Sequence, residues 1–330
     1  MLGRRLFCQA LAGTGVTVSA FGAAQTRTKV YRMGHLEIGR ADESPGPPSD
    51  PIAIEFETEL ARLGLVEGVN RITDYRSARG NPTLLDGLAA DLVAAQPDVL
   101  FTGSGFVGAR ALKRATTTIP IVFAAVGNPV AAGLVASLAR PGGNLTGGSV
   151  PVELDLKRVQ ILFEVLGASA SIVLLTTPVS EPRMAWFLKD LTASRLRVKF
   201  QEVRKSEDLA PAFEQMARQR ADGVAVASSL LTGTHQPEIA ALAIKHRIPA
   251  IGDGTTFTDL GLMMSYSVDW LQVARNAANY LYKILNGAQP VNLPIQQVTN
   301  FDFVVNRKAA RALSIRIPSP VLIAATRIID

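Results

Sequence analysis

Few side chains in this 330-residue chain could carry out covalent or metal chemistry. It contains one cysteine, Cys8, and three histidines. These counts exclude a disulfide framework, an iron–sulfur site and a multi-cysteine zinc site. The sequence has no Gly-x-Ser-x-Gly elbow, no Walker loop and no His-Glu-x-x-His motif, although a Ser-His-Asp arrangement could still assemble from distant positions. We therefore expect no enzymatic activity.

A glycine-rich motif, Gly103-Ser104-Gly105-Phe106-Val107-Gly108, matches the dinucleotide-binding fingerprint. A dinucleotide site needs this turn after the first strand of its domain and an acidic residue about 20 positions later. Here the motif follows the third expected strand, and the next strand ends at Val126-Gly127-Asn128 with no acid. We therefore expect no nicotinamide, flavin or other cofactor. The motif either brings backbone N–H groups close to an anionic ligand group or forms a tight turn that binds nothing.

The histidines are the next candidates for ligand contacts. His35 follows the first expected strand, so it either contacts a ligand between two domains or lies in a surface loop. His235 and His246 are separated by an expected helix, and His246 at its end favours a capping or surface position.

Alternating strands and helices must position these residues. Short apolar runs, typical of buried parallel strands, alternate with segments whose apolar residues recur at helical spacing. The expected strands are 29–36, 71–75, 99–102, 121–126, 171–176, 198–203, 223–228, 248–252 and 262–267, and the expected helices are 52–63, 84–95, 107–115, 131–139, 156–166, 183–194, 209–218, 237–246 and 270–286. This order predicts an α/β fold of two doubly wound, Rossmann-like lobes with parallel sheets and a ligand cleft between them.

Composition supports a folded chain of about two domains, at roughly 150 residues per domain. The chain is 48% hydrophobic and 19% charged, whereas disordered chains have fewer apolar and more charged residues. Its 34 Lys and Arg exceed its 28 Asp and Glu, which gives a formal net charge of +6. The positive charges are scattered along the chain, so we expect no nucleic-acid partner.

Residues 1–24 are typical of an export signal. Arg4-Arg5-Leu6-Phe7 precedes an uncharged run, and Gly22-Ala23-Ala24 supplies small residues for cleavage. The arginine pair is similar to the twin-arginine signal, the ordinary secretory route stays open, and an amphipathic first helix is the alternative. We expect cleavage near Ala24 and a periplasmic location. Cleavage would remove Cys8, which leaves no thiol and no membrane anchor.

Several segments carry a family resemblance. The most specific, residues 138–147, reads Leu-Ala-Arg-Pro-Gly-Gly-Asn-Leu-Thr-Gly; others are residues 64–70, 115–123, 126–130, 133–137, 243–250, 261–266 and 292–318. In order and spacing they resemble the ABC transporter substrate-binding protein family, which includes tryptophan- and phenylalanine-type binding proteins. The resemblance covers essentially the whole mature chain.

The resemblance implies a type I periplasmic-binding-protein fold, in which two lobes joined by three crossings close on a small ligand. We expect an N-terminal lobe of residues 28–147 plus 268–287 and a C-terminal lobe of residues 148–267 plus 288–330. It also implies an extracytoplasmic, monomeric solute-binding protein that presents a polar or aromatic ligand, an amino acid or related carboxylate, to an ABC permease in the inner membrane. A sensory or signalling receptor of the same fold, without its own permease, is the alternative.

The resemblance places the ligand contacts in the loops that follow the strands. These contacts are His35, Ser104, Gly105, Gly127 and Asn128 in the first lobe and Thr177, Ser229 and Asp253 in the second.

Three departures from the family pattern affect this set. Asn128 stands where the family often has Asp, and an amide cannot hold an ammonium group by charge. Asp253 is the remaining acid that could pair with an amine, or it could cap the helix expected from Thr255. Thr177-Pro178 replaces the usual Asn-Pro, and the proline-rich loop 39–51 either lines the cleft or is an exposed insertion.

Overall fold

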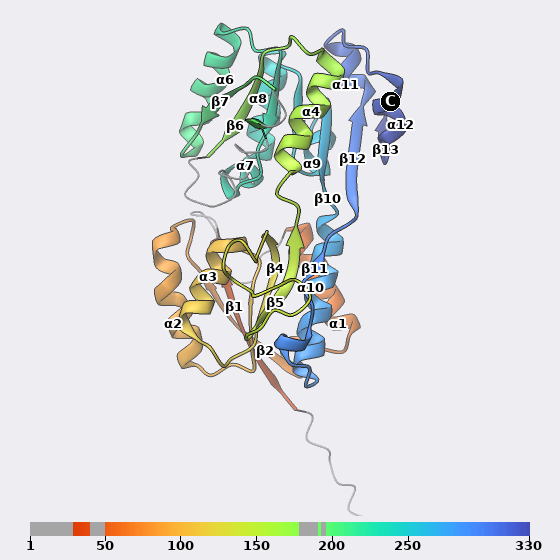
Figure 1. The fold of residues 1–330 in the computed structure, drawn as a ribbon. Helices are drawn as coiled ribbons and strands as arrows, with labels where there is room; N and C mark the ends of the chain where they lie inside the picture. The colour runs from red at the N-terminus through yellow and green to blue at the C-terminus, as the bar shows by residue number, and fades with distance from the viewer. Residues whose placement is uncertain (1–28, 40–49, 178–190, 193–195) are drawn as a thin grey trace, which may run out of the picture.

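The computed structural model describes residues 29–39, 50–177, 191–192 and 196–330. The leader 1–24, most of the proline-rich loop 39–51, Pro178 and most of the expected helix 183–194 lie outside the described residues. The described chain forms two mostly parallel sheets covered by helices, which confirms the predicted α/β fold (Figure 1).

The first sheet has six strands, all paired in parallel. Their order is β11-β5-β4-β3-β1-β2, where β1 is Tyr31–Glu37, β2 is Arg71–Ser77, β3 is Val99–Thr102, β4 is Ile121–Gly127, β5 is Leu145–Val150 and β11 is Gln296–Gln297. Four helices cover it: α1 (Pro51–Arg62), α2 (Leu85–Ala94), α3 (Gly105–Ala115) and α10 (Trp270–Leu285). Because side chains alternate along a strand, Met33 and Val99 pack against α1 and α10, whereas Leu36 and Leu100 pack against α2 and α3.

The second sheet has seven strands in the order β13-β12-β10-β9-β8-β6-β7. They are β6 (Ile172–Thr176), β7 (Val198–Glu202), β8 (Gly223–Val226), β9 (Ala250–Gly252), β10 (Met264–Val268), β12 (Phe301–Asn306) and β13 (Arg327–Ile329). Within the described part of this sheet, only β10 and β12 pair antiparallel. The accompanying helices are α4 (Leu154–Leu166), α6 (Leu209–Arg218), α7 (Leu230–Thr234), α8 (Gln236–Lys245), α9 (Thr255–Asp259), α11 (Arg307–Ala312) and α12 (Ser319–Ala324). Short 3₁₀ helices in the described chain are Pro82–Leu84, Ser206–Asp208 and Pro290–Asn292.

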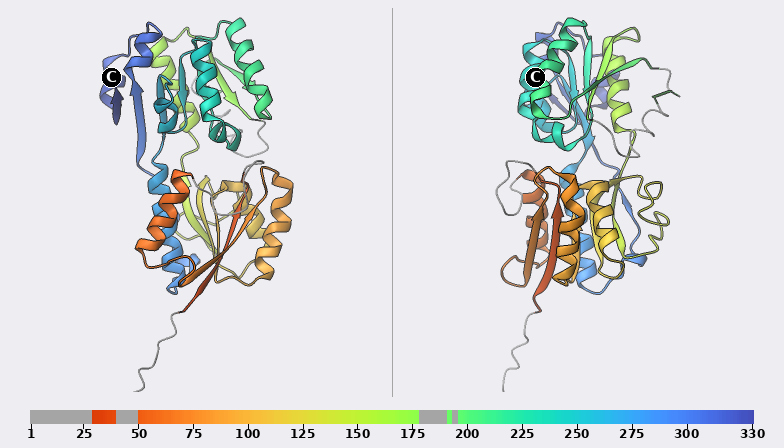
Figure 2. Two further views of the ribbon diagram at one scale, coloured as in Figure 1. Left: turned by 180° about the vertical axis from the view of Figure 1, so that it is seen from behind. Right: turned by 90° about the vertical axis from the view of Figure 1, so that its left-hand side faces the viewer.

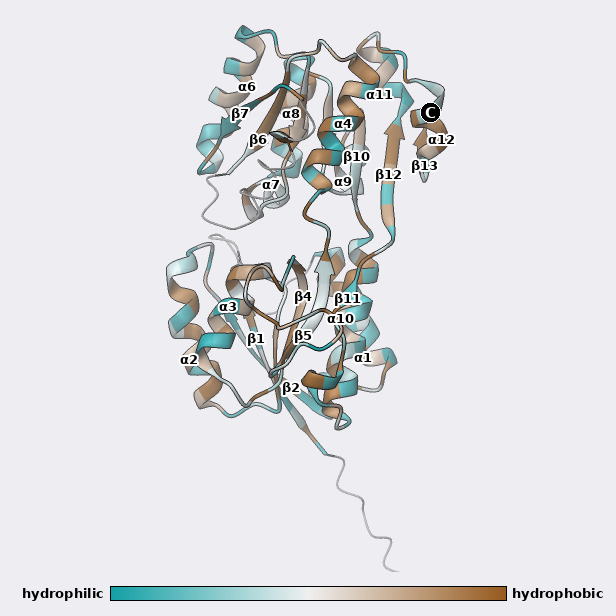
Figure 3. Cartoon of the chain, in the orientation of Figure 1, coloured by the Kyte–Doolittle hydropathy of each residue, from teal (hydrophilic) through white to brown (hydrophobic). Residues whose placement is uncertain are grey.

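The two sheets form two lobes, one above the other (Figures 1 and 2). The carboxyl ends of β1 and β4 face the second lobe, and that of β6 faces the first (Figure 1). Because β3 pairs in parallel with β1 and β4, and β8 and β9 are joined to β6 by parallel pairing, their carboxyl ends face the same way as those of their neighbours. The described chain passes between the lobes at three places: between β5 and α4, between β10 and α10, and between β11 and β12. Hydrophobic residues concentrate on the strands and the helix faces packed on them (Figure 3). Because the carboxyl ends of these strands face the opposite lobe, the loops that follow them lie where the lobes face each other.

The expected helix 131–139 is wrong, because this segment forms turns. Gly133 has a left-handed backbone, with φ of +69°. The Lys113 ammonium donates to the carbonyls of Gly133 and Leu134, at 2.6 and 3.0 Å, and so replaces helical hydrogen bonds.

Strand β5 was not expected because its Gly147-Gly148 pair carries no strand signal. A Cβ on Gly147 would overlap the carbonyl oxygen of Phe123 on β4, so close approach of the two strands requires glycine here. The predicted lobe boundaries at 147/148 and 287/288 stay a prediction. Strand pairing places all of β5 in the first sheet, although β5 runs past the first boundary to Val150. It also places Gln296–Gln297, which lies past the second boundary, in the first sheet.

Candidate functional site

His35 lies near the carboxyl end of β1 and is buried, so it is not a surface-loop residue. Its ring makes edge contacts with Tyr75 and Phe101, at centroid distances of 4.8 and 4.7 Å. Its Nε2 is hydrogen-bonded to Glu37 Oε1 at 2.9 Å. The His35 ring is therefore packed inside the lobe, and its hydrogen bond to Glu37 connects it to the polar groups at the strand end.

Glu37 joins the ends of β1 and β3. Its Oε1 accepts from the backbone N–H of Gly103 at 2.5 Å, and its Oε2 accepts from Ser104 Oγ at 2.5 Å. Ser104 Oγ in turn accepts from the backbone N–H of Ile38 at 2.6 Å. Glu37 is not among the site residues predicted from the sequence. The feature of the sequence that could have indicated Glu37 is an acidic residue at the end of a strand, two positions after His35. In the fold, this strand end lies beside the glycine-rich loop.

Gly105, Gly127 and Asn128 lie on the two neighbouring loops. Gly105 begins α3 with φ of +56°, and Gly127 ends β4. Asn128 is exposed with φ of +44°, and its Oδ1 accepts from the backbone N–H of Ala131 at 3.1 Å. The side-chain oxygen of Asn128 therefore stabilises its own turn, as asparagine does in many turns.

A fully buried arginine, Arg158 on α4, connects three neighbouring strands of the second sheet. Its Nη1 donates to Oδ1 of Asp253 after β9 at 3.0 Å, and to the carbonyl of Tyr266 on β10 at 2.7 Å. Its Nη2 donates to Oγ of Ser228 after β8 at 2.8 Å, and to Asp155 one turn earlier on α4. Arg158 is not among the site residues predicted from the sequence.

The signal for Arg158 was its position in the helix. It lies four residues after Leu154 and four before Leu162, on the apolar face that packs against the sheet. A charged residue at such a position needs partners in the folded protein, because burying an unpaired charge is very costly.

The Arg158 guanidinium is kept charged by its two carboxylate partners. Burial alone lowers the pKa of Arg158, but Asp253 and Asp155 together raise it above its ordinary value. Among the described residues, Nε has no hydrogen-bond partner.

Asp253 does not cap the following helix. The N-cap of α9 is Gly254, without a side-chain cap, and Asp253 points to Arg158 instead. Ser229 caps α7: its Oγ accepts from the backbone N–H of Thr232 at 3.1 Å. Thr177 follows β6 and is half-buried. All three residues lie at strand ends that face the first lobe (Figure 1).

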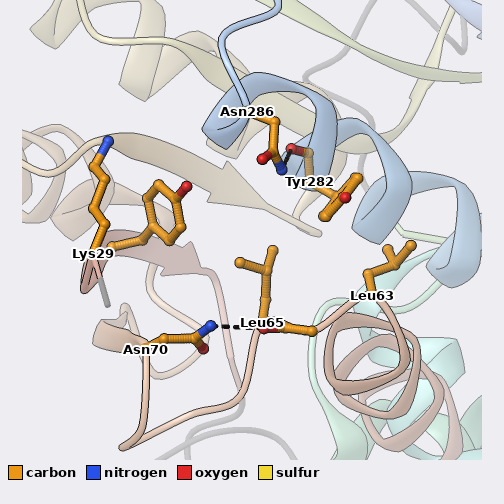
Figure 4. Close-up of a pocket in the computed structure, with 8 residues that line it drawn as sticks. Lys29, Leu63, Leu65, Asn70, Tyr282 and Asn286 are labelled. Atoms are coloured by element: carbon orange, nitrogen blue, oxygen red, sulfur yellow. Dashed lines mark hydrogen bonds between the residues drawn. The ribbon is translucent and has the colours of Figure 1, made fainter. Parts of the chain in front are cut away.

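Two pockets in the described residues are lined by other parts of the lobes. One, of about 230 Å³, lies at the far end of the first lobe between Leu65 and Tyr282 (Figure 4). The other, of about 290 Å³, lies beside α4 and is lined by Tyr266, Phe301 and Phe303. Neither pocket contains a predicted site residue.

The described residues contain no group of three or more His, Cys, Asp or Glu side chains that could hold a metal ion. Across the same ranges, none of the helices has the length and apolar content needed to cross a membrane.

Comparison with known proteins identifies relatives over most of the chain. The family model described as ABC transporter substrate binding protein matches residues 46–329. A tyrosine-binding protein of Clostridioides difficile is 23% identical over 297 residues, covering 89% of this chain and 85% of that protein.

Solved structures show the same fold. A conserved domain protein of Vibrio cholerae is 29% identical, with a TM-score of 0.78, and the match covers 91% of this chain and 100% of that one. The ABC domain of Streptococcus pneumoniae in complex with L-Trp is 23% identical, with a TM-score of 0.77 and the same coverage of both chains.

Proposed function

Because the chain belongs to the ABC transporter substrate-binding protein family, with the type I periplasmic-binding-protein fold, we propose that it is the solute-binding component of an ABC importer. It captures a small molecule between its lobes and presents it to a permease in the inner membrane. The observation that carries this proposal is the arrangement of polar groups on facing strand ends, with the Glu37–Ser104 set on one lobe and the Arg158–Asp253 cluster on the other.

The proposed ligand is an aromatic amino acid or a related aromatic carboxylate. A relative is named for tyrosine, and the Streptococcus pneumoniae structure holds L-Trp. The chain itself offers an acid for the ammonium group. Of the two oxygens of Asp253, only Oδ1 has a partner among the described residues, and the side chain is 12% exposed. Asp253 therefore binds the ligand's ammonium group through its other oxygen.

The first lobe binds the ligand's carboxylate. The first N–H groups of a helix have no partner within the helix and carry partial positive charge, and α3 begins at Gly105 directly after Ser104. These donors face the second lobe. Each charge-assisted hydrogen bond contributes about 1.5–3 kcal/mol. Gly127 and Asn128 on this lobe, and Thr177 and Ser229 on the other, complete the polar lining, and His35 acts through Glu37.

Closure of the two lobes makes ligand binding detectable by a partner. A ligand held by both lobes stabilises the closed state relative to the open one, because only the closed state allows all its contacts. The match to an ABC transporter family supports delivery to a permease over the sensory alternative. The protein works in the periplasm as a monomer after its leader is removed near Ala24.

A thermal-shift screen tests this function. The protein is purified from the periplasmic fraction, where Gln25 is its expected first residue, and screened with L-Trp, L-Tyr, L-Phe, benzoate and short polar amino acids. A ligand at 100 times its Kd stabilises the native state by about 2.7 kcal/mol, so an aromatic amino acid should raise the melting temperature by several degrees. The Asp253→Asn variant should lose most of this shift. No shift from any aromatic amino acid or carboxylate would contradict the proposed ligand class.

A further inference from the structure

Arg158 lies beside the proposed ligand site but cannot contact a ligand directly. Its side chain is fully buried. A guanidinium carries two N–H groups on each terminal nitrogen. Nη1 has two acceptors, Asp253 and the Tyr266 carbonyl, and Nη2 has two acceptors, Asp155 and Ser228. All four terminal N–H groups are therefore used within the lobe, which excludes the usual role of arginine as the binder of a ligand carboxylate.

The contacts of Arg158 fix the relative positions of three neighbouring strands. Strands β8, β9 and β10 are adjacent in the second sheet. Arg158 bonds to Ser228 after β8, to Asp253 after β9 and to Tyr266 on β10, so a single rigid fork sets the positions of all three. The Asp253 carboxylate is thereby held by one oxygen, and its rotation is restricted.

The carboxylate of Asp253 is the part of the Arg158 cluster that a ligand can reach, and its negative charge determines which ligand group it attracts. Asp155 and Arg158 are 3% and 0% exposed, whereas the Asp253 side chain is 12% exposed. The part of the cluster that reaches the surface is therefore the carboxylate of Asp253. A cation placed there pairs with this carboxylate, whereas a ligand carboxylate would be repelled.

We propose that Arg158 is a positioning residue that orients Asp253 and so makes the site selective for ligands with an ammonium group. This inference rests on the proposed function, because it assigns a selectivity to the same inter-lobe site. It predicts that the amine-free analogue of a ligand binds much more weakly than the amino acid. It also predicts that this discrimination depends on a side chain that the ligand never contacts.

The test compares L-tryptophan with 3-(indol-3-yl)propionate, which differs only in lacking the ammonium group. Calorimetric titration gives both Kd values, and their ratio measures the discrimination. The wild-type protein should prefer L-tryptophan by about 10- to 100-fold, the range of one charge-assisted hydrogen bond. Asp253→Asn and Arg158→Gln should each reduce the ratio to about 3 or less. The double variant should reduce the ratio no further, because both substitutions remove the same interaction with the ammonium group.

Two further variants make the outcome decisive. Arg327→Gln removes an exposed ion pair with Asp259 in the same lobe and should leave the ratio unchanged. Arg158→Lys keeps the buried positive charge but lacks the planar fork, so it should fold and show a reduced ratio even if Arg158→Gln does not fold. General loosening of the lobe would weaken the binding of both compounds equally and leave the ratio of their Kd values unchanged.

Each result has one meaning. If the wild-type protein discriminates and both Arg158 variants keep its ratio, the role of Arg158 is overturned while the proposed function stands. If the wild-type protein binds both compounds equally well, the ammonium selectivity is overturned. If the wild-type protein binds neither compound nor any other member of the screen, the proposed function itself fails, and the inference with it.

Discussion

Glycine at position 103 is required by its neighbour Glu37. A Cβ on Gly103 would lie 2.7 Å from Glu37 Oε1, the atom that accepts the hydrogen bond from the Gly103 N–H. Carboxylate side chains often move away at low cost, but this one is also bonded to His35 and Ser104. A side chain at position 103 must therefore break bonds that align the ends of β1 and β3.

Gly103→Ala should destabilise the protein by about 1–2 kcal/mol, because displaced Glu37 loses charge-assisted hydrogen bonds. It should also weaken ligand binding by about tenfold or more, because Ser104 and the start of α3 lose their alignment. Thermal melting and calorimetry measure the two effects.

The matched control is Gly87→Ala on α2, where a Cβ would meet no atom within 4 Å. It should stabilise the protein by about 0.5–1 kcal/mol, as expected for alanine in a helix, and should leave ligand affinity unchanged. Equal effects of the two substitutions would show that Glu37 does not constrain position 103.

At the scale of elements, helices α1 and α10 are joined by polar contacts across a gap of about 220 residues in the chain. Glu59 on α1 accepts from Asn279 on α10 at 2.9 Å, and from Nε of Arg62 at 2.6 Å. The hydrogen bond from Arg62 lowers the pKa of Glu59, burial opposes this shift, and Asn279 adds to it. The lowered pKa means that the ionised carboxylate stabilises the folded lobe.

The stabilisation by Glu59 should depend on pH. It is fully present above the pKa of an unfolded glutamate, about 4.3, and is lost as the pH falls through the lower pKa of the folded state. Glu59→Gln should therefore lower the melting temperature clearly at pH 7 and much less near pH 3. The control, Glu214→Gln at an exposed position on α6, should change little at either pH. A constant difference for Glu59→Gln across this range would contradict the assignment.

The strands and helices with clear apolar periodicity were predictable, because burial on a sheet leaves its period in the sequence. Helix 209–218 has the bounds that the sequence predicts, and α10 differs by one residue. The segment 131–139 was not predictable, since a distant lysine supplies its hydrogen bonds. Nor was β5, because its glycines are required by contact with β4.

The same distinction applies to the candidate site. Loop positions such as Ser104 and Asp253 could be found because they follow strands in the sequence. Glu37 and Arg158 were missed because their roles come from partners 66 to 108 positions away, which only the folded chain brings together. The side chains that orient the site were thus harder to predict than the loops that form it.

At the scale of the whole molecule, the account depends on two lobes that contribute different groups to one ligand. The first lobe offers helix N–H donors beside Ser104, and the second offers the carboxylate of Asp253. Three connecting segments join the lobes, which allows them to move relative to each other while staying attached. A pocket confined to one lobe, such as that beside Tyr282, could not couple binding to closure.

The most direct test of this account is a crystal structure of the protein with the aromatic amino acid that gives the largest thermal shift. We predict that the ligand lies between the lobes, with its ammonium group within hydrogen-bond distance of Asp253 and its carboxylate at Ser104 and the start of α3. A ligand bound within one lobe, in the pocket beside Tyr282 or in the pocket beside Tyr266, would contradict the account.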